Sequence, residues 1–149
     1  MAIENIETAR AMRLEKLNKI LDANVARNKA IEKAKALPCF KNPTDLKPLS
    51  GGITNVNICV TDDNGKFVVR LGTDIPEHGV MRWNELALSE AAQKLGVSPG
   101  VVHCEPGILV LEFIDARTFE EADIREASNL IRVINLVAKT HRGLGKHLN

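Results

Sequence analysis

A short turn between two apolar segments is the feature that most constrains this sequence. Residues 55–61 and 66–72 are rich in Val, Ile, Leu and Phe, and Asp62-Asp63-Asn64-Gly65 lies between them. β-branched and aromatic residues favour strands, and Asn-Gly is the strongest short-range signal for a β-hairpin, because a type I′ turn needs positive φ at both central positions. We therefore predict two antiparallel strands joined by a type I′ turn.

The pattern after this hairpin predicts one helix and a second hairpin. Residues 81–95 carry apolar side chains at helical spacing, and Gly96 is placed to end that helix. Residues 101–104 and 108–113 read as strands around Glu105-Pro106-Gly107. A short edge strand at 46–49, where Pro48 is tolerated, precedes both hairpins. We predict an α+β fold: a mostly antiparallel sheet of about five strands with one packed helix, plus helices at both ends.

The first 37 residues predict a long helix. The segment 3–37 has neither Gly nor Pro, and its apolar stripe includes Ile6, Leu14, Leu17, Leu21, Val25 and Ile31. Two abutting helices, broken near Asp22-Ala23-Asn24, are the alternative. We expect the stripe to pack on the sheet or on a missing part of the molecule, and a dimerisation helix is a second alternative.

A helical region is also expected from Phe119 to Arg142. Its apolar positions, which we predict to be the buried side, are Leu130, Ile131, Ile134, Leu136, Val137 and His141. One small sheet covers less apolar surface than such helices carry, and an uncovered patch predicts dimerisation or aggregation. The chain then divides into a helical extension (1–45), a sheet-containing lobe (46–115) and the start of a helical second lobe (116–149).

Composition excludes several classes of function. The 20 Lys and Arg nearly balance the 19 Asp and Glu, so neither a nucleic-acid nor a membrane partner is expected. No segment approaches the apolar length of a membrane span, and the first residues lack a signal-peptide pattern. Three scattered cysteines, with no Cys-x-x-Cys pair, predict reduced thiols, a cytoplasmic protein and no metal site at these cysteines.

The segment Ser50-Gly51-Gly52-Ile53-Thr54-Asn55 is the candidate ligand-binding loop. Without a Cβ, Gly51 and Gly52 let backbone amides approach a ligand, and successive amides form a nest for phosphate oxygens. The alternative is that the two glycines only turn the chain into its strand. Arg70 on the second strand, Glu85 on the following helix and the strand end at Glu112-Phe113-Ile114 follow in the order of a kinase nucleotide-binding lobe.

These motifs resemble the choline/ethanolamine kinase and aminoglycoside phosphotransferase family. The similarity is to sequences of bacterial choline kinases and extends over about residues 46–142. It is carried by Ser50–Asn55, Phe67-Val68-Val69-Arg70-Leu71 and Leu111–Ile114. The resemblance implies a protein-kinase-like N-terminal lobe that binds ATP. It implies that amides of Ser50, Gly51, Gly52, Ile53, Thr54 and Asn55 cover the phosphates and that Arg70, held by Glu85, contacts them. The backbone of Glu112, Phe113 and Ile114 would bind adenine.

The catalytic part of the family pattern is missing. In the family, a His-x-Asp-x-x-x-x-Asn loop and a magnesium-binding Asp lie beyond the helix that here ends near His141, and the sequence stops at Asn149. His141-Arg142-Gly143 resembles the start of such a loop, but Gly143 occupies the place of the aspartate and cannot orient a hydroxyl. We therefore expect no catalytic residue and no Mg²⁺ ligand in this chain, and the magnesium ligands in a missing second lobe.

Three functions remain open. In the first, the chain is the truncated ATP-binding lobe of a phosphotransferase acting on choline or a similar amino alcohol, and is inactive alone. In the second, it is a non-catalytic interaction module with the same lobe fold. In the third, it is a fragment of an aminoglycoside phosphotransferase, although the sequence Gly51–Asn55 favours the choline kinases within this family. A homodimer is compatible with each.

Overall fold

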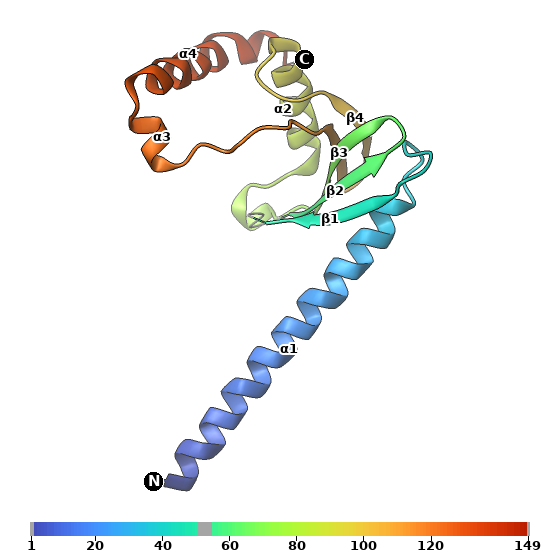
Figure 1. Cartoon of the computed structure of the whole chain (residues 1–149), viewed down its shortest axis with the longest axis vertical. Helices are drawn as coiled ribbons and strands as arrows, with labels where there is room; N and C mark the ends of the chain where they lie inside the picture. The colour runs from blue at the N-terminus through green and yellow to red at the C-terminus, as the bar shows by residue number, and fades with distance from the viewer. Residues whose placement is uncertain (1, 51–54, 149) are drawn as a thin grey trace.

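The computed structural model describes residues 2–50 and 55–148 of the chain. In chain order its main elements are α1 (Ala2–Lys35), β1 (Asp45–Leu49), β2 (Val56–Asp62), β3 (Gly65–Leu71), α2 (Arg82–Leu95), β4 (Val101–Glu105), β5 (Ile108–Glu112), α3 (Glu121–Arg125) and α4 (Ala127–Gly143). Short 3₁₀ turns lie at Pro76–His78 and Leu144–Lys146. Figure 1 shows α1 below the sheet, with α2 and α4 above it.

The five strands form one antiparallel sheet. Their order is β1-β2-β3-β5-β4, so the hairpin β4–β5 joins the sheet through β5. The two predicted hairpins are β2–β3 and β4–β5, and the predicted strand with Pro48 lies at an edge, as β1. α2 ends at Gly96 as expected. The predicted α+β fold is confirmed.

The first hairpin forms without the predicted type I′ turn. Among the described residues only glycines have positive φ, so Asp63 and Asn64 both keep negative values. Gly65, at φ 129°, carries the unusual angle and pairs with Asp62 across the hairpin. A left-handed conformation brings a Cβ too close to the next carbonyl, and glycine has no Cβ. The hairpin prediction is confirmed and its turn type is wrong.

The buried Asp62 carboxylate ties this hairpin to the segment that follows α1. Its Oδ1 accepts hydrogen bonds from the backbone amides of Asn42 (2.7 Å) and Lys41 (3.1 Å), and its Oδ2 accepts one from the Asn64 side chain (3.2 Å). The Asn42 amide contributes most to lowering the pKa of Asp62, and burial opposes it. The ionised carboxylate therefore fixes the connection between α1 and the sheet.

The two faces of the sheet differ because successive strand residues point to opposite sides. The face toward α1 is an apolar core made of Ile58, Val60, Val69, Leu71, Ile108 and Val110. The last turns of α1, with Ala30, Ala34 and the adjoining Leu37, complete this core. The other face carries Asn57 and Arg70, and α2 lies on that side (Figure 1).

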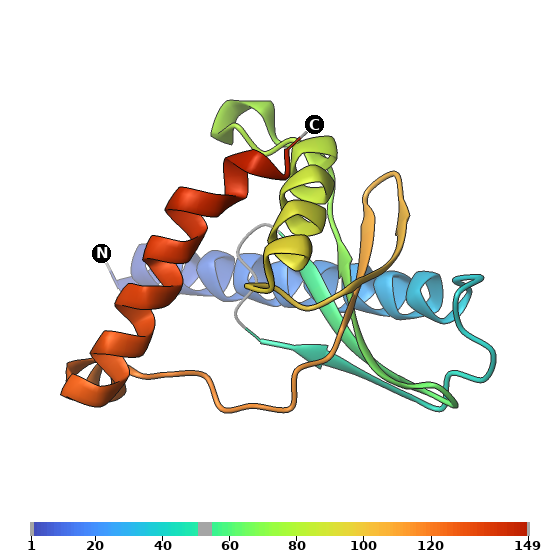
Figure 2. The same ribbon diagram turned by 90° about the horizontal axis from the view of Figure 1, so that it is seen from above.

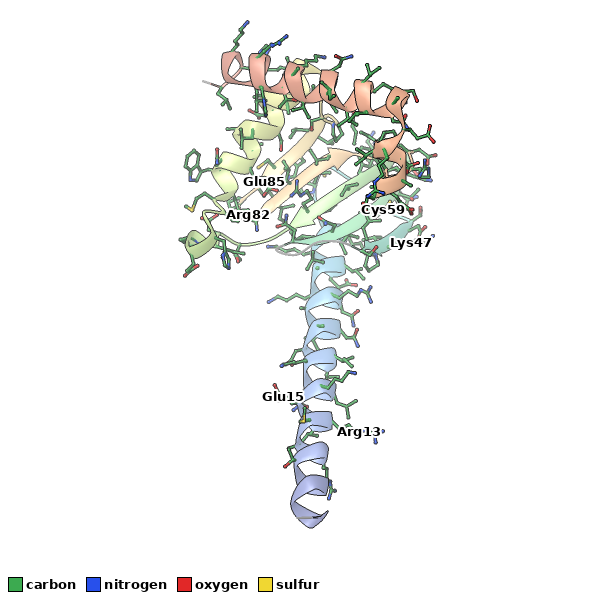
Figure 3. The ribbon with its side chains drawn as sticks, turned by 90° about the vertical axis from the view of Figure 1, so that its left-hand side faces the viewer. Arg13, Glu15, Lys47, Cys59, Arg82 and Glu85 are labelled. Atoms are coloured by element: carbon green, nitrogen blue, oxygen red, sulfur yellow. The ribbon has the colours of Figure 1, made fainter. Side chains whose placement is uncertain are left out.

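Most of α1 projects away from the sheet. The helix is unbroken, so the alternative break near Asp22 is wrong. Figures 1 and 3 show its N-terminal part extending from the lobe, with Arg13 and Glu15 far from the sheet. The stripe residues Leu14, Leu17, Leu21 and Val25 are 55% to 62% exposed. The expectation that they pack on the sheet is wrong, because only the last turns of α1 reach it.

α3 and α4 form where helices were predicted, but their apolar side is not buried. The exposed fractions of Leu130, Ile131, Ile134, Leu136 and Val137 range from 41% to 61%, and His141 is exposed as well. α4 meets the lobe at its C-terminal end, where Gly143 lies against Leu95 of α2 (Figure 2). The expected burial is therefore wrong within this chain, and the expected uncovered patch is present.

None of the described helices combines the length and the apolar character needed to cross a membrane.

Candidate functional site

The site begins where β1 passes into β2. Ser50 follows β1 and is exposed, and Asn55 immediately precedes β2. Gly51, Gly52, Ile53 and Thr54 lie outside the described residues. The predicted loop is thus located by its two ends, both at the end of the sheet that also carries the C-terminus of β3.

Arg70 and Glu85 form the ion pair that was predicted. Arg70 Nη2 lies 2.6 Å from Glu85 Oε1, and their side chains are 34% and 19% exposed. Arg70 points from β3 toward α2, and Glu85 lies in the first turn of α2. A guanidinium held by a carboxylate keeps further N–H donors for an anion such as a phosphate.

Arg82, which the sequence analysis missed, contacts the same carboxylate. Its Nη1 lies 2.7 Å from Glu85 Oε2, so each oxygen of Glu85 contacts a different arginine. Figure 3 shows Arg82 and Glu85 side by side at the start of α2. Their spacing of three residues places both side chains on one side of a helix, and that spacing was the available sequence signal. Two guanidinium groups and one carboxylate leave a net positive charge at this position.

Strand register places two rows of side chains on the Arg70 face. Asn57 of β2, Arg70 of β3 and Leu109 of β5 are paired in one row. Two residues along each strand, Cys59, Val68 and Leu111 form the other row. Because strands rise about 3.3 Å per residue, the rows lie roughly 7 Å apart. This face therefore combines a polar row near Glu85 with an apolar row beside the end of β5.

The apolar row was not predicted as part of the site. Burial raises the pKa of the Cys59 thiol, so this side chain stays protonated at neutral pH. A protonated thiol behaves as a small apolar group. Cys59 thus belongs to an apolar wall, in keeping with its neighbours Val68 and Leu111.

The predicted hinge follows directly from this row. The amides of Glu112 and Phe113 donate to the carbonyls of Gly100 (2.9 Å) and Lys66 (3.1 Å). Within the described part of the chain, the amide of Ile114 has no protein acceptor, and its carbonyl accepts from Ala116 (3.0 Å). Of the three hinge amides, that of Ile114 is therefore the one available to a ligand.

Two cavities near the site overlap its charged side chains only in part. A small one of about 20 Å³, lined by Arg70, Arg82 and Glu85, has room for about one water molecule. A cavity of about 1040 Å³ lies between α1 and the end of the sheet, against Lys29, Val56 and Trp83. Asn55, Gly72 and Arg82 line this cavity, whereas Arg70 and the hinge do not.

A metal ion needs several donor side chains close together. Across residues 2–50 and 55–148, no three His, Cys, Asp or Glu side chains are grouped so that they could hold one. Mg²⁺ prefers carboxylate and phosphate oxygens in octahedral geometry. The described residues therefore include no ready-made group of three protein ligands for a metal ion.

The comparisons with known proteins concern the fold. No family model and no curated protein sequence matches the chain. Among solved structures, an ethanolamine kinase from Plasmodium vivax superimposes with a TM-score of 0.57 at 19% sequence identity. The match covers 66% of this chain and 26% of that protein, so the matched part spans about a quarter of the kinase's length. The chain thus has a choline/ethanolamine kinase-like fold and forms a kinase-like lobe.

Proposed function

We propose that this chain is the ATP-binding lobe of a choline-kinase-like phosphotransferase, which transfers the γ-phosphate of ATP to the hydroxyl of a small amino alcohol. The observation that carries the proposal is the pairing of Arg70 with Glu85 on the same sheet face as the hinge. Phosphoryl transfer depends mainly on positioning and on charge stabilisation, so an arginine held in place near an adenine-binding edge is the part expected of this lobe.

Each end of the face has a role in nucleotide binding. The backbone at Glu112–Ile114 binds the adenine edge, with the amide of Ile114 as donor, and Cys59, Val68 and Leu111 pack against the ring. Arg70 donates to oxygens of the α- and β-phosphates, and amides of Ser50–Asn55 cover them. A planar guanidinium suits this role because its parallel N–H groups match phosphate oxygens.

The lobe binds ATP and does not take the proton from the acceptor hydroxyl. His141-Arg142-Gly143 only resembles the start of a kinase catalytic loop, because Gly143 replaces the aspartate of that pattern and a glycine has no group to orient the acceptor hydroxyl. We expect the magnesium ligands in the second lobe, because no three His, Cys, Asp or Glu side chains are grouped among the described residues. We therefore predict that the 149-residue chain does not phosphorylate choline and binds ATP weakly. The acceptor pocket belongs to a second lobe, and the boundaries 1–45, 46–115 and 116–149 are part of this proposal.

A second candidate is a non-catalytic interaction module. The exposed apolar side of α4 favours it, since such a surface marks a contact with another protein or another lobe. The two candidates differ in nucleotide binding, because a module without it has no need of Arg70 facing the phosphates. An aminoglycoside kinase lobe would bind ATP in the same way and differ only in its acceptor.

The test is a titration of the ¹⁵N-labelled chain with millimolar ATP, followed by NMR, with and without Mg²⁺. We expect shifts of the amides of Ile114 and Val68 and of the Arg70 side chain. Choline alone should shift none of them. Arg117→Ala is the matched control, because Arg117 is an exposed arginine paired with Asp123 outside the site. If ATP shifts neither the hinge nor Arg70, the interaction module is favoured, and robust choline phosphorylation by this chain would overturn the prediction of inactivity.

A further inference from the structure

Arg82 makes more defined contacts than an arginine at a helix start needs. Its Nε donates to the carbonyl oxygen of Thr73 at 2.9 Å, and its Nη1 lies 2.7 Å from Glu85 Oε2. Its own backbone amide donates to Asp74 Oδ1 at 2.7 Å, which caps the first turn of α2. The side chain is only 14% exposed. One guanidinium thus joins the segment after β3 to the acid that holds Arg70.

These contacts connect Arg70, Glu85 and Arg82 to the backbone that follows β3. Arg70 contacts Glu85 Oε1, and Arg82 contacts Glu85 Oε2. Arg82 also donates to the backbone carbonyl of Thr73, three residues after Arg70. A carboxylate held at both oxygens cannot rotate without losing one of two charge-assisted hydrogen bonds. Arg82 therefore restricts the orientation of Glu85, and Glu85 restricts Arg70.

Gly72 makes room for this arrangement. A Cβ at Gly72 would lie 2.4 Å from Arg82 Nη2 and 2.5 Å from Asn55 Oδ1, so any side chain there would displace one of them. Both of these atoms are buried and have no hydrogen-bond partner in the described part of the chain. A donor and an acceptor without partners lie against the same glycine. The two atoms are therefore close neighbours, and buried polar groups strongly favour pairing.

We infer that Arg82 is a positioning residue, which sets Glu85 and through it Arg70, and links both to Asn55 at the exit of the phosphate-binding loop. The inference rests on the proposed function for its role in phosphate binding. Its geometry stands without a nucleotide, because all contacts of Arg82 are made within the chain. It assigns a role to Gly72 as well, as the position that must lack a side chain.

The substitution Arg82→Lys separates this role from a simple charge effect. A lysine keeps the positive charge but has one nitrogen, so it cannot bind Glu85 and the Thr73 carbonyl in the fixed geometry of a guanidinium. If charge alone matters, Arg82→Lys behaves as the native chain. If positioning matters, Arg82→Lys resembles Arg82→Gln.

The first measurement is the ¹⁵N NMR signal of the Arg70 side chain in the absence of nucleotide. We expect slow exchange of the Arg70 Nε–H with water in the native chain and fast exchange in Arg82→Gln, Arg82→Lys and Gly72→Ala. The control Arg117→Ala should leave the Arg70 signal unchanged. Amide spectra establish that each variant is folded, and Gly72→Ala keeps the test open if one Arg82 variant does not fold. An unchanged Arg70 signal in the folded Arg82 variants overturns the inference.

The second measurement compares the affinities for ADP and adenosine. Both Arg82 variants should lower the ratio of ADP to adenosine affinity by about tenfold, the effect of one charge-assisted hydrogen bond of roughly 1.4 kcal/mol. A role in folding alone would weaken the binding of both ligands together. That result, or a native ADP-to-adenosine affinity ratio in Arg82→Lys, overturns the inference. If the native chain itself binds ADP no better than adenosine, the proposed function fails, while the Arg70 signal still decides the role of Arg82.

Discussion

The two faces of the sheet serve different purposes, although they are built from alternate residues of the same strands. The face toward α1 is continuous and apolar, with Ile58, Val60, Val69 and Val110 fully buried. The opposite face holds the ion pairs of Glu85 and ends at the hinge. Apart from Asp62, the buried strand residues of the first face are apolar, whereas the second face has charged groups that a purely structural face would not need. Stability and binding are thus separated by one residue along each strand.

The largest effect is expected from the apolar face. Ile58→Ala should lower the free energy of unfolding by about 2–5 kcal/mol, because it removes buried methylene groups and leaves a cavity. Urea unfolding measures this change. Cys59→Ala is the control on the opposite face, where the side chain is only partly buried. Equal losses for the two variants would mean that the faces do not differ in their structural role.

A smaller and different effect is expected from Arg70→Ala. The variant should lose less than about 1 kcal/mol of folding stability, as for partly exposed ion pairs. Its affinity for ADP should fall roughly 10-fold or more, because a charged hydrogen bond contributes about 1.5–3 kcal/mol. Calorimetry or NMR titration measures the affinity, with Arg117→Ala as the control. In a protein that carries the second lobe, turnover should also fall strongly, and activity that survives the change would refute the phosphate role of Arg70.

The Asp62 hydrogen bonds predict a pH effect confined to the structural side. The pKa of Asp62 is lowered in the folded chain, so its carboxylate stabilises the fold above the ordinary value of 3.8. This contribution disappears as the pH falls through the lowered folded pKa. The native chain should therefore lose more stability than Asp62→Asn between neutral pH and about pH 3. Urea unfolding at both pH values tests this, and Asp63→Asn, one residue away in the turn, should keep the native dependence.

The smallest effect is expected on the free part of α1. Leu17→Lys should change the unfolding free energy by less than about 0.5 kcal/mol, because an exposed side chain loses little on substitution. Ala34→Leu, in the packed part of the same helix, should cost about 1–3 kcal/mol by overpacking. Size-exclusion chromatography of both variants completes the test. If Leu17→Lys lowers the stability or the apparent size substantially, the stripe is covered in solution and the dimerisation alternative is supported.

The sequence by itself determined the elements whose causes are local. The hairpins, the end of α2 at Gly96 and the edge strand with Pro48 depend on neighbouring residues, so a pattern of a few positions was enough. The type of turn was not determined, because Gly65 rather than Asn64 took the positive φ. The order Arg70, Glu85 and hinge was readable through the family resemblance, and the ion pair between the first two is present.

Tertiary structure decided which apolar stripes are covered and which side chains share the site. Helical periodicity shows that Leu17 and Ile134 lie on apolar sides, but only the placement of α1 and α4 shows that no other described part of the chain covers either side. The row of Cys59, Val68 and Leu111 exists because β5 pairs with β3, a non-local contact that spacing does not specify. Arg82 reaches Glu85 through helix spacing, but its link to Thr73 and Gly72 depends on how closely α2 approaches the end of β3. Local sequence sets the backbone of each element, whereas distances between elements follow from packing, and the chemistry of this site depends on those distances.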